Sequence, residues 1–145
     1  MGRDLVATAD IAIDAPRSTV WKVVTDAALL SRAFFGAQVE TDWREGSPIT
    51  FSGEWEGKQF RDKGEIVAVQ ANEVLRFTHY SPMTGLPDTP DNYHTVTFEL
   101  SDRDRQTELT ITQTNVGSEE EQRHSEANWE RVAKAAKELA EGSSD

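Results

Sequence analysis

Apolar and polar residues alternate along the segment LVATADIAI, residues 5–13. A period of two places the apolar side chains on one face, which is typical of a strand that buries that face. Pro16 then suits the first turn of a helix, where its missing N–H needs no partner, and Val20, Trp21 and Val24 recur at helical spacing. The pattern predicts a strand that turns directly into a helix, with Trp21 in the core.

A second short helix and a series of strands follow. The helix is predicted over AALLSRAFF, residues 27–35, with Asp26 as its N-cap and Gly36 after its end. From Gly36 to Val116 apolar residues alternate again, with turn residues between the segments. Because successive strands joined by tight turns pair with one another, this region predicts an antiparallel meander. Its six strands are predicted at residues 36–43, 48–55, 64–71, 73–80, 95–102 and 107–114.

The segment 81–92 interrupts this regular spacing. It contains three prolines and one glycine, and it is too long for a tight hairpin turn. Few apolar residues are present to hold it against the protein. We therefore expect this loop to be among the most mobile parts of the backbone.

The C-terminal region predicts a long helix. Ser118 and Glu121 have the spacing of a capping box, and Gly142 lies just past the end, after which the tail is expected to fray. The first half of this helix has almost no apolar face. Small residues in its second half either let the helix approach the sheet closely or leave a cavity, and the residues alone do not decide between these. The apolar stripe consists of Trp129, Val132, Ala133, Ala136, Leu139 and Ala140.

Composition and charge limit the classes of protein to which the chain can belong. With 145 residues and no cysteine, it has the size of one domain that folds without disulfides, and we expect a single domain over residues 1–145. The N-terminus lacks the apolar core of a secretory signal, which predicts a cytoplasmic protein. A net charge of -11 disfavours nucleic acid and anionic membrane surfaces as partners.

The predicted order of elements is β-α-α-β-β-β-β-β-β-α. Strands in succession, closed by one long helix, are typical of an α+β fold. We expect a curved antiparallel sheet wrapped around the long C-terminal helix.

Few residues suggest catalysis or cofactor binding. His79 and His94 flank the long loop, and if their strands pair, both imidazoles face one pocket. No cysteine or H-x-x-x-H spacing supplies further zinc ligands, and no nucleophile motif or phosphate-binding loop is present. We interpret the histidines as hydrogen-bonding groups in an apolar pocket, with acid–base catalysis as the alternative. Strand parity turns Glu54 outward, so we expect no paired-carboxylate site. From the missing ligand spacings and the missing phosphate loop, we also expect no metal and no cofactor.

Several segments of the sequence resemble the START-like superfamily, also called SRPBCC. Within it, the chain is similar to the branch homologous to the activator of the heat-shock protein 90 ATPase. This resemblance implies a helix-grip fold with a cavity between the sheet and the C-terminal helix, used for apolar ligands and in some branches for catalysis. The segments that carry it are IDAPRSTVWKVVTDAALLSRAFF, REGSPITF, DKGEIVAVQANEVLRFTHY, HTVTFELSDRDRQTELTITQT and NWERVAKAAKEL.

Pattern and resemblance together predict a protein that binds a small, mostly apolar molecule in this cavity. One alternative is a protein-binding module that assists a chaperone in the stress response, as the family name implies. The other is a cyclase- or hydrolase-like enzyme that uses the same cavity, with Tyr80 or Tyr93 beside the histidines; of binding and catalysis, we favour binding. The predicted ligand-binding residues are Phe34, Phe51, Trp55, Phe77, His79, His94, Phe98, Ile111, Trp129, Ala133 and Ala136.

Overall fold

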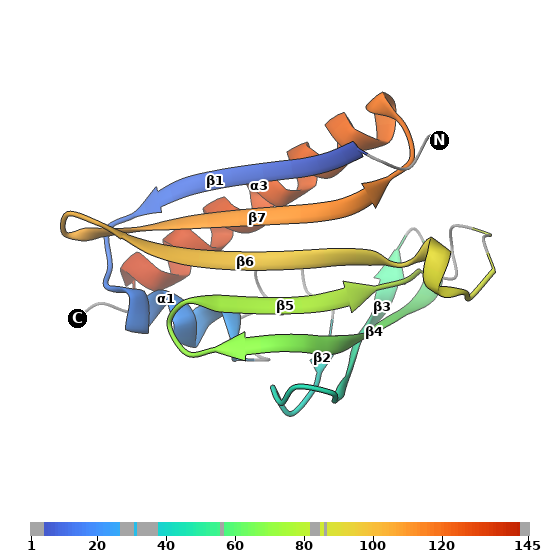
Figure 1. Cartoon of the computed structure of the whole chain (residues 1–145), viewed down its shortest axis with the longest axis horizontal. Coiled ribbons are helices and arrows are strands. Elements are labelled where there is room, and N and C mark those ends of the chain that lie inside the picture. The colour runs from blue at the N-terminus through green and yellow to red at the C-terminus, as the bar shows by residue number, and fades with distance from the viewer. Residues whose placement is uncertain are drawn as a thin grey trace.

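The computed structural model describes residues 5–26, 31, 38–55, 57–81, 85 and 87–142. The described residues form a seven-stranded sheet with a long C-terminal helix against one face (Figure 1). The predicted α+β helix-grip fold is confirmed. The second predicted helix, residues 27–35, lies outside the described residues apart from Ser31.

The sheet confirms the predicted antiparallel meander. Its strand order is β1-β7-β6-β5-β4-β3-β2, so each strand from β2 to β6 pairs with the next one along the chain, and β1 pairs with β7. The elements are β1 (Leu5–Ile13), α1 (Arg17–Val24), β2 (Gln38–Glu40), β3 (Pro48–Trp55), β4 (Lys58–Gln70), β5 (Val74–His79), the 3-10 helix η2 (Pro90–Asn92), β6 (His94–Arg103), β7 (Gln106–Val116) and α3 (Glu119–Gly142).

Strand β4 begins at Lys58, ahead of its predicted start at Gly64. Its first part pairs with β3 as far as Glu65, and the part from Ile66 onward pairs with β5. The backbones of β4 and β5 come close together at Gly64, where a Cβ would lie 1.6 Å from the carbonyl oxygen of Thr78. Only a residue without a side chain allows this close approach of two backbones. The early part of β4 was missed because its residues are mostly charged or polar.

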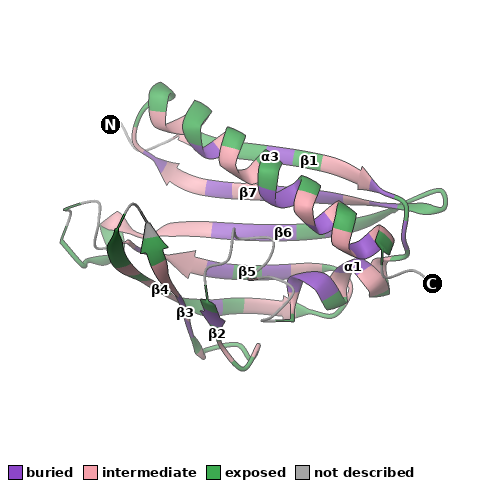
Figure 2. Cartoon of the chain, turned by 180° about the vertical axis from the view of Figure 1, so that it is seen from behind, coloured by how far each residue is buried: buried purple, intermediate pink, exposed green. Residues whose placement is uncertain are grey.

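The core lies between the inner face of the sheet and the two described helices. Figure 2 shows α3 crossing this face, with buried residues on the strands beneath it. Helix α1 directs Val20, Val23 and Val24 into the same core, whereas Trp21 is only partly buried and packs against it. The largest fully buried side chains in the sheet are Ile13, Ile49, Ile66, Leu75, Phe77, Phe98, Leu109 and Ile111.

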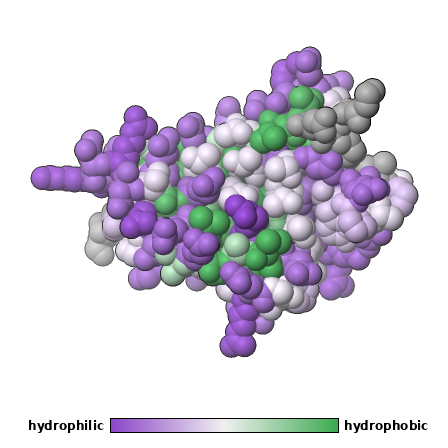
Figure 3. Space-filling model, in the orientation of Figure 1, coloured by the Kyte–Doolittle hydropathy of each residue, from purple (hydrophilic) through white to green (hydrophobic). Residues whose placement is uncertain are grey.

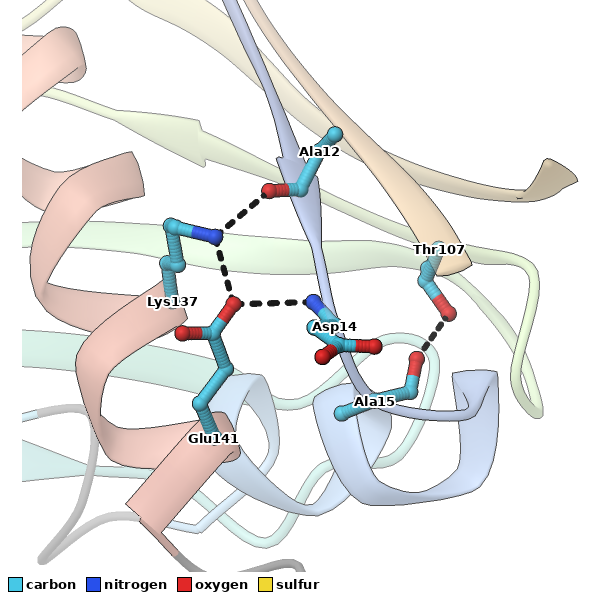
Figure 4. Close-up of polar contacts among 6 residues, drawn as sticks. All are labelled: Ala12, Asp14, Ala15, Thr107, Lys137 and Glu141. Atoms are coloured by element: carbon cyan, nitrogen blue, oxygen red, sulfur yellow. Dashed lines mark hydrogen bonds and ion pairs between the residues drawn. The ribbon is translucent and has the colours of Figure 1, made fainter. Parts of the chain in front are cut away.

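Polar side chains of α3 satisfy the free backbone groups at the edge of β1. Lys137 donates to the carbonyl of Ala12 at 3.0 Å, and Glu141 accepts from the backbone N–H of Asp14 at 2.9 Å (Figure 4). Because an unpaired edge strand can pair with another chain, these contacts protect this edge. Two similar contacts lie earlier on the helix, from Gln122 to the Val6 carbonyl (2.8 Å) and from the Thr8 N–H to Glu126 (3.1 Å).

The outer face of the sheet is mostly polar. Figure 3 shows this face covered largely by hydrophilic or near-neutral side chains, with apolar atoms in small areas. Among the described residues, the large hydrophobic side chains that are exposed are Val6 and Val67, at 40% and 44%. No helix within the described part of the chain is long and apolar enough to cross a membrane.

Candidate functional site

A cavity of about 390 Å³ lies between the first half of α3 and the inner face of the sheet. Side chains from β3 to β7 form its floor, and one stripe of α3 forms its roof, because residues 121, 125, 128, 129 and 132 recur at helical spacing. The half of the helix without an apolar stripe therefore faces the cavity. The described lining residues are Phe51, Phe60, Asp62, Phe77, His79, Ser81, His94, Val96, Gln113, Glu121, Ser125, Asn128, Trp129 and Val132.

Aromatic rings make up much of the apolar wall. The rings of Phe51 and Phe77 lie 5.7 Å apart, and Phe77 packs on Phe98 at 6.1 Å. Phe98 and Trp129 form a T-shaped pair, with ring centroids 6.0 Å apart and ring planes at 87°. Trp129 also donates its indole N–H to the side-chain oxygen of Gln113 at 2.7 Å. These contacts hold the lining rings of Phe51, Phe77 and Trp129 in place.

Two histidines and a carboxylate form the polar end of the cavity. His79 and His94 are direct partners across β5 and β6, as predicted. His79 Nε2 lies 3.0 Å from Asp62 Oδ2, and His94 Nδ1 lies 2.9 Å from the carbonyl oxygen of Thr114. Each imidazole is thus held in place by an acceptor outside the apolar wall.

Asp62 is the carboxylate at this polar end of the cavity, and the sequence analysis did not predict it. Its side chain is only 16% exposed, and within the described structure its buried Oδ1 has no hydrogen-bond partner. The available signal was a strand-like alternation in residues 59–64. It places Phe60, Asp62 and Gly64 on one face and Gln59, Arg61 and Lys63 on the other. It was hidden because a strand with few apolar residues does not stand out from a loop.

The predicted ligand-binding residues fall into three groups. Phe51, Phe77, His79, His94 and Trp129 line the cavity together. The side chains of Phe98, Ile111, Ala133 and Ala136 are buried in the core and are not among the described lining residues. Phe34 and the side chain of Trp55 lie outside the described structure. Besides Asp62, eight lining residues were not among the predicted ligand-binding residues: Phe60, Ser81, Val96, Gln113, Glu121, Ser125, Asn128 and Val132.

Apart from the two histidines, the ionisable side chains in the described lining are acidic. Asp62 and Glu121 contribute carboxylates, and the lining includes no lysine or arginine. Glu121 Oε2 accepts from the backbone N–H of Gly117 at 2.8 Å, as part of the cap of α3. In the described parts of the chain, no three His, Asp or Glu side chains are grouped closely enough to hold a metal ion.

The loop between β5 and β6 begins at the cavity, because Ser81, just after β5, belongs to the lining. The described end of this loop is tied to the sheet, because Asp88 forms an ion pair with Lys63 and accepts from the hydroxyl of Tyr93 at 2.6 Å. These two hydrogen bonds lower the pKa of the Asp88 carboxyl, the one from Lys63 being the larger cause. Tyr93 also stacks on Tyr80 at 5.2 Å. The mobility of this loop stays a prediction.

A curved antiparallel sheet that holds a cavity against a long C-terminal helix defines the helix-grip class of proteins. The chain belongs to the family described as Activator of Hsp90 ATPase homolog 1-like protein, whose profile matches residues 14–141. No functionally curated protein matches the sequence.

Two solved structures place the chain among its relatives. ChR145 from Cytophaga hutchinsonii, determined in solution, is 39% identical, with 98% of this chain and 97% of that chain covered and a TM-score of 0.84. The Aha1 dimer from Colwellia psychrerythraea is 15% identical, with 94% of this chain and 96% of that chain covered and a TM-score of 0.73. The second likeness shows the fold alone.

Proposed function

We propose that the protein binds a small, mostly apolar molecule in the cavity beneath the first half of α3. The observation that carries this proposal is the cavity itself, whose volume of about 390 Å³ lies in the range of small-molecule sites. Its wall of aromatic and aliphatic side chains offers a gain of roughly 25 cal/mol for each Å² of apolar surface buried. After the cost of ordering the ligand, this supports affinities in about the micromolar range.

A neutral dye tests the proposal directly. N-phenyl-1-naphthylamine fluoresces in apolar surroundings, so we expect its emission to rise when it binds the protein. Val132 is 2% exposed and lines the cavity, and Val132→Phe should weaken binding at least about tenfold by filling the space. The matched control is Val67→Phe, which adds the same bulk at an exposed position on the outer face of β4. Equal dye binding by all three proteins would contradict the proposal.

A second candidate function is acid–base catalysis at the same site. The contact between His79 and Asp62 at 3.0 Å favours it, because a carboxylate that orients an imidazole is a common arrangement of a general base. The test is hydrolysis of 4-nitrophenyl butyrate by the wild type and by His79→Gln. A rate above background that disappears in the variant would support an enzyme. A background rate in both proteins would leave binding as the function for this cavity.

Chaperone binding is supported by the family description. Native mass spectrometry of the protein purified from its own cells separates this function from ligand binding. A retained small molecule supports the cavity, whereas a retained chaperone supports the protein-binding function.

A further inference from the structure

The polar end of the cavity carries hydrogen-bond acceptors whose arrangement follows from the partners of the two histidines. The carbonyl oxygen of Thr114 can only accept, so the Nδ1 atom of His94, 2.9 Å away, carries the proton. An ionised Asp62 likewise only accepts, so the Nε2 atom of His79, 3.0 Å away, carries the proton there. In a neutral His79 ring, Nδ1 is then an acceptor atom.

The carboxylates around these imidazole rings also accept hydrogen bonds. Asp62 on β4 and Glu121 on α3 are carboxylates, and no lysine or arginine is found among the described lining residues. Ser81, Ser125 and Asn128 add small polar groups that can donate as well as accept. A ligand carboxylate placed here would approach the carboxylates of Asp62 and Glu121, with no lysine or arginine in the described lining to compensate the charge, which is unfavourable at a partly buried site.

We propose that this cavity selects an uncharged apolar ligand whose polar group donates a hydrogen bond, such as a phenol or an alcohol, and rejects a carboxylate of the same shape. This inference rests on the proposed function, because it names the chemistry of the ligand that the cavity binds. A hydroxyl group gives its proton to an imidazole nitrogen or a carboxylate at the polar end, while its apolar body lies against Phe51, Phe77 and Trp129.

Three ligands that share one apolar body test this selection. They are 2-naphthol, 2-naphthoate and 2-methylnaphthalene, all titrated in the same buffer near neutral pH. Binding is followed by backbone and indole resonances of Phe51, Phe77 and Trp129. We expect 2-naphthol to bind at least about tenfold more tightly than 2-naphthoate, and more tightly than 2-methylnaphthalene.

One variant and its control test whether Asp62 causes the preference for 2-naphthol over 2-naphthoate. Asp62→Asn keeps the shape of the side chain but removes its charge and adds a donor, so it should tighten binding of 2-naphthoate about tenfold and reduce the preference for 2-naphthol. Glu65→Gln makes the same change of charge on the same strand, at an exposed position that does not line the cavity. It should leave both affinities unchanged.

The outcomes separate the selection of a hydroxyl ligand from the binding of any apolar ligand in the cavity. Binding of 2-naphthoate as tight as that of 2-naphthol by the wild type overturns the selection but leaves the cavity as a ligand site. Equal binding of 2-naphthol and 2-methylnaphthalene also overturns it, because the hydroxyl group would then not be recognised. If none of the three shifts any cavity resonance, the proposed function fails and the selection fails with it. The comparison in the wild type stands even if Asp62→Asn does not fold.

Discussion

Trp129 on α3 and Gln113 on β7 are joined by a hydrogen bond of 2.7 Å from the indole N–H to the side-chain carbonyl. Gln113 is only 8% exposed, so its oxygen has little access to water. The bond therefore connects the roof of the cavity to its floor. Phe98 lies against the same indole ring, so that polar and apolar contacts together hold this part of the helix above the sheet.

The first prediction concerns this bond. Trp129→Phe keeps an aromatic ring but removes the donor, and it leaves a buried acceptor without its partner. We expect a loss of about 1 to 3 kcal/mol in the free energy of unfolding, measured by urea denaturation. The double variant with Gln113→Leu serves as control, because removal of both polar groups should restore part of this loss. The single variant Gln113→Leu completes the comparison. If the loss of stability in the double variant equals the sum of the losses in the two single variants, the bond contributes nothing.

A second prediction concerns the close approach of β4 and β5. Gly64→Ala would place a methyl group 1.6 Å from the Thr78 carbonyl oxygen, so the two strands must separate locally. We expect a loss of about 3 kcal/mol or more, together with a changed resonance of the His79 ring, since Asp62 is two residues away. Gly142→Ala is the control: its added methyl group meets no atom within 4 Å, and it should change stability by less than about 1 kcal/mol.

The fold was readable from the sequence because most of its elements carry a clear period. Alternation in β1 and β7 and the capping box of α3 each predicted the element that the structure has. The pairing of His79 with His94 also followed from the sequence, because two consecutive strands on either side of one loop form an antiparallel pair.

The polar half of the site was less accessible to sequence reasoning. Asp62 lies in a stretch of charged residues that resembles a loop, and its contact with His79 depends on the close packing of β4 and β5 at Gly64. Ser125 and Asn128 lie in the half of α3 without an apolar stripe, where a solvent-facing helix is the ordinary expectation. Whether polar residues face water or a cavity depends on tertiary packing, which their spacing does not encode.

A third prediction concerns the end of α3. The hydrogen bond from Lys137 lowers the pKa of the Glu141 carboxyl below its ordinary value of 4.5, and the Asp14 backbone N–H adds to this effect. Because the pKa is lower in the folded state, this carboxylate stabilises the fold above pH 4.5, and the contribution is lost as the pH falls through the lowered value.

We therefore expect Glu141→Gln to be less stable than the wild type at neutral pH, with a difference that shrinks as the pH falls below 4.5. Thermal unfolding across this range measures it. Glu138→Gln, at an exposed position on the same helix, should show no such trend. A difference that stayed constant down to acid pH would mean that the Lys137 contact does not perturb this carboxyl.

The last prediction distinguishes the packed part of α3 from the part above the cavity. Ala136 is 1% exposed and lies in the core, and it does not belong to the described lining. Val132, about one turn earlier, is 2% exposed and does line the cavity.

Ala136→Leu should overpack the contact between helix and sheet and cost about 1 to 3 kcal/mol, without a direct effect on the ligand site. Val132→Leu adds its methylene group to open space, so it should cost less than about 1 kcal/mol and reduce ligand affinity. Urea denaturation and titration with N-phenyl-1-naphthylamine measure both quantities. If Ala136→Leu were as stable as the wild type but bound the dye more weakly, the cavity would extend beneath the second half of the helix.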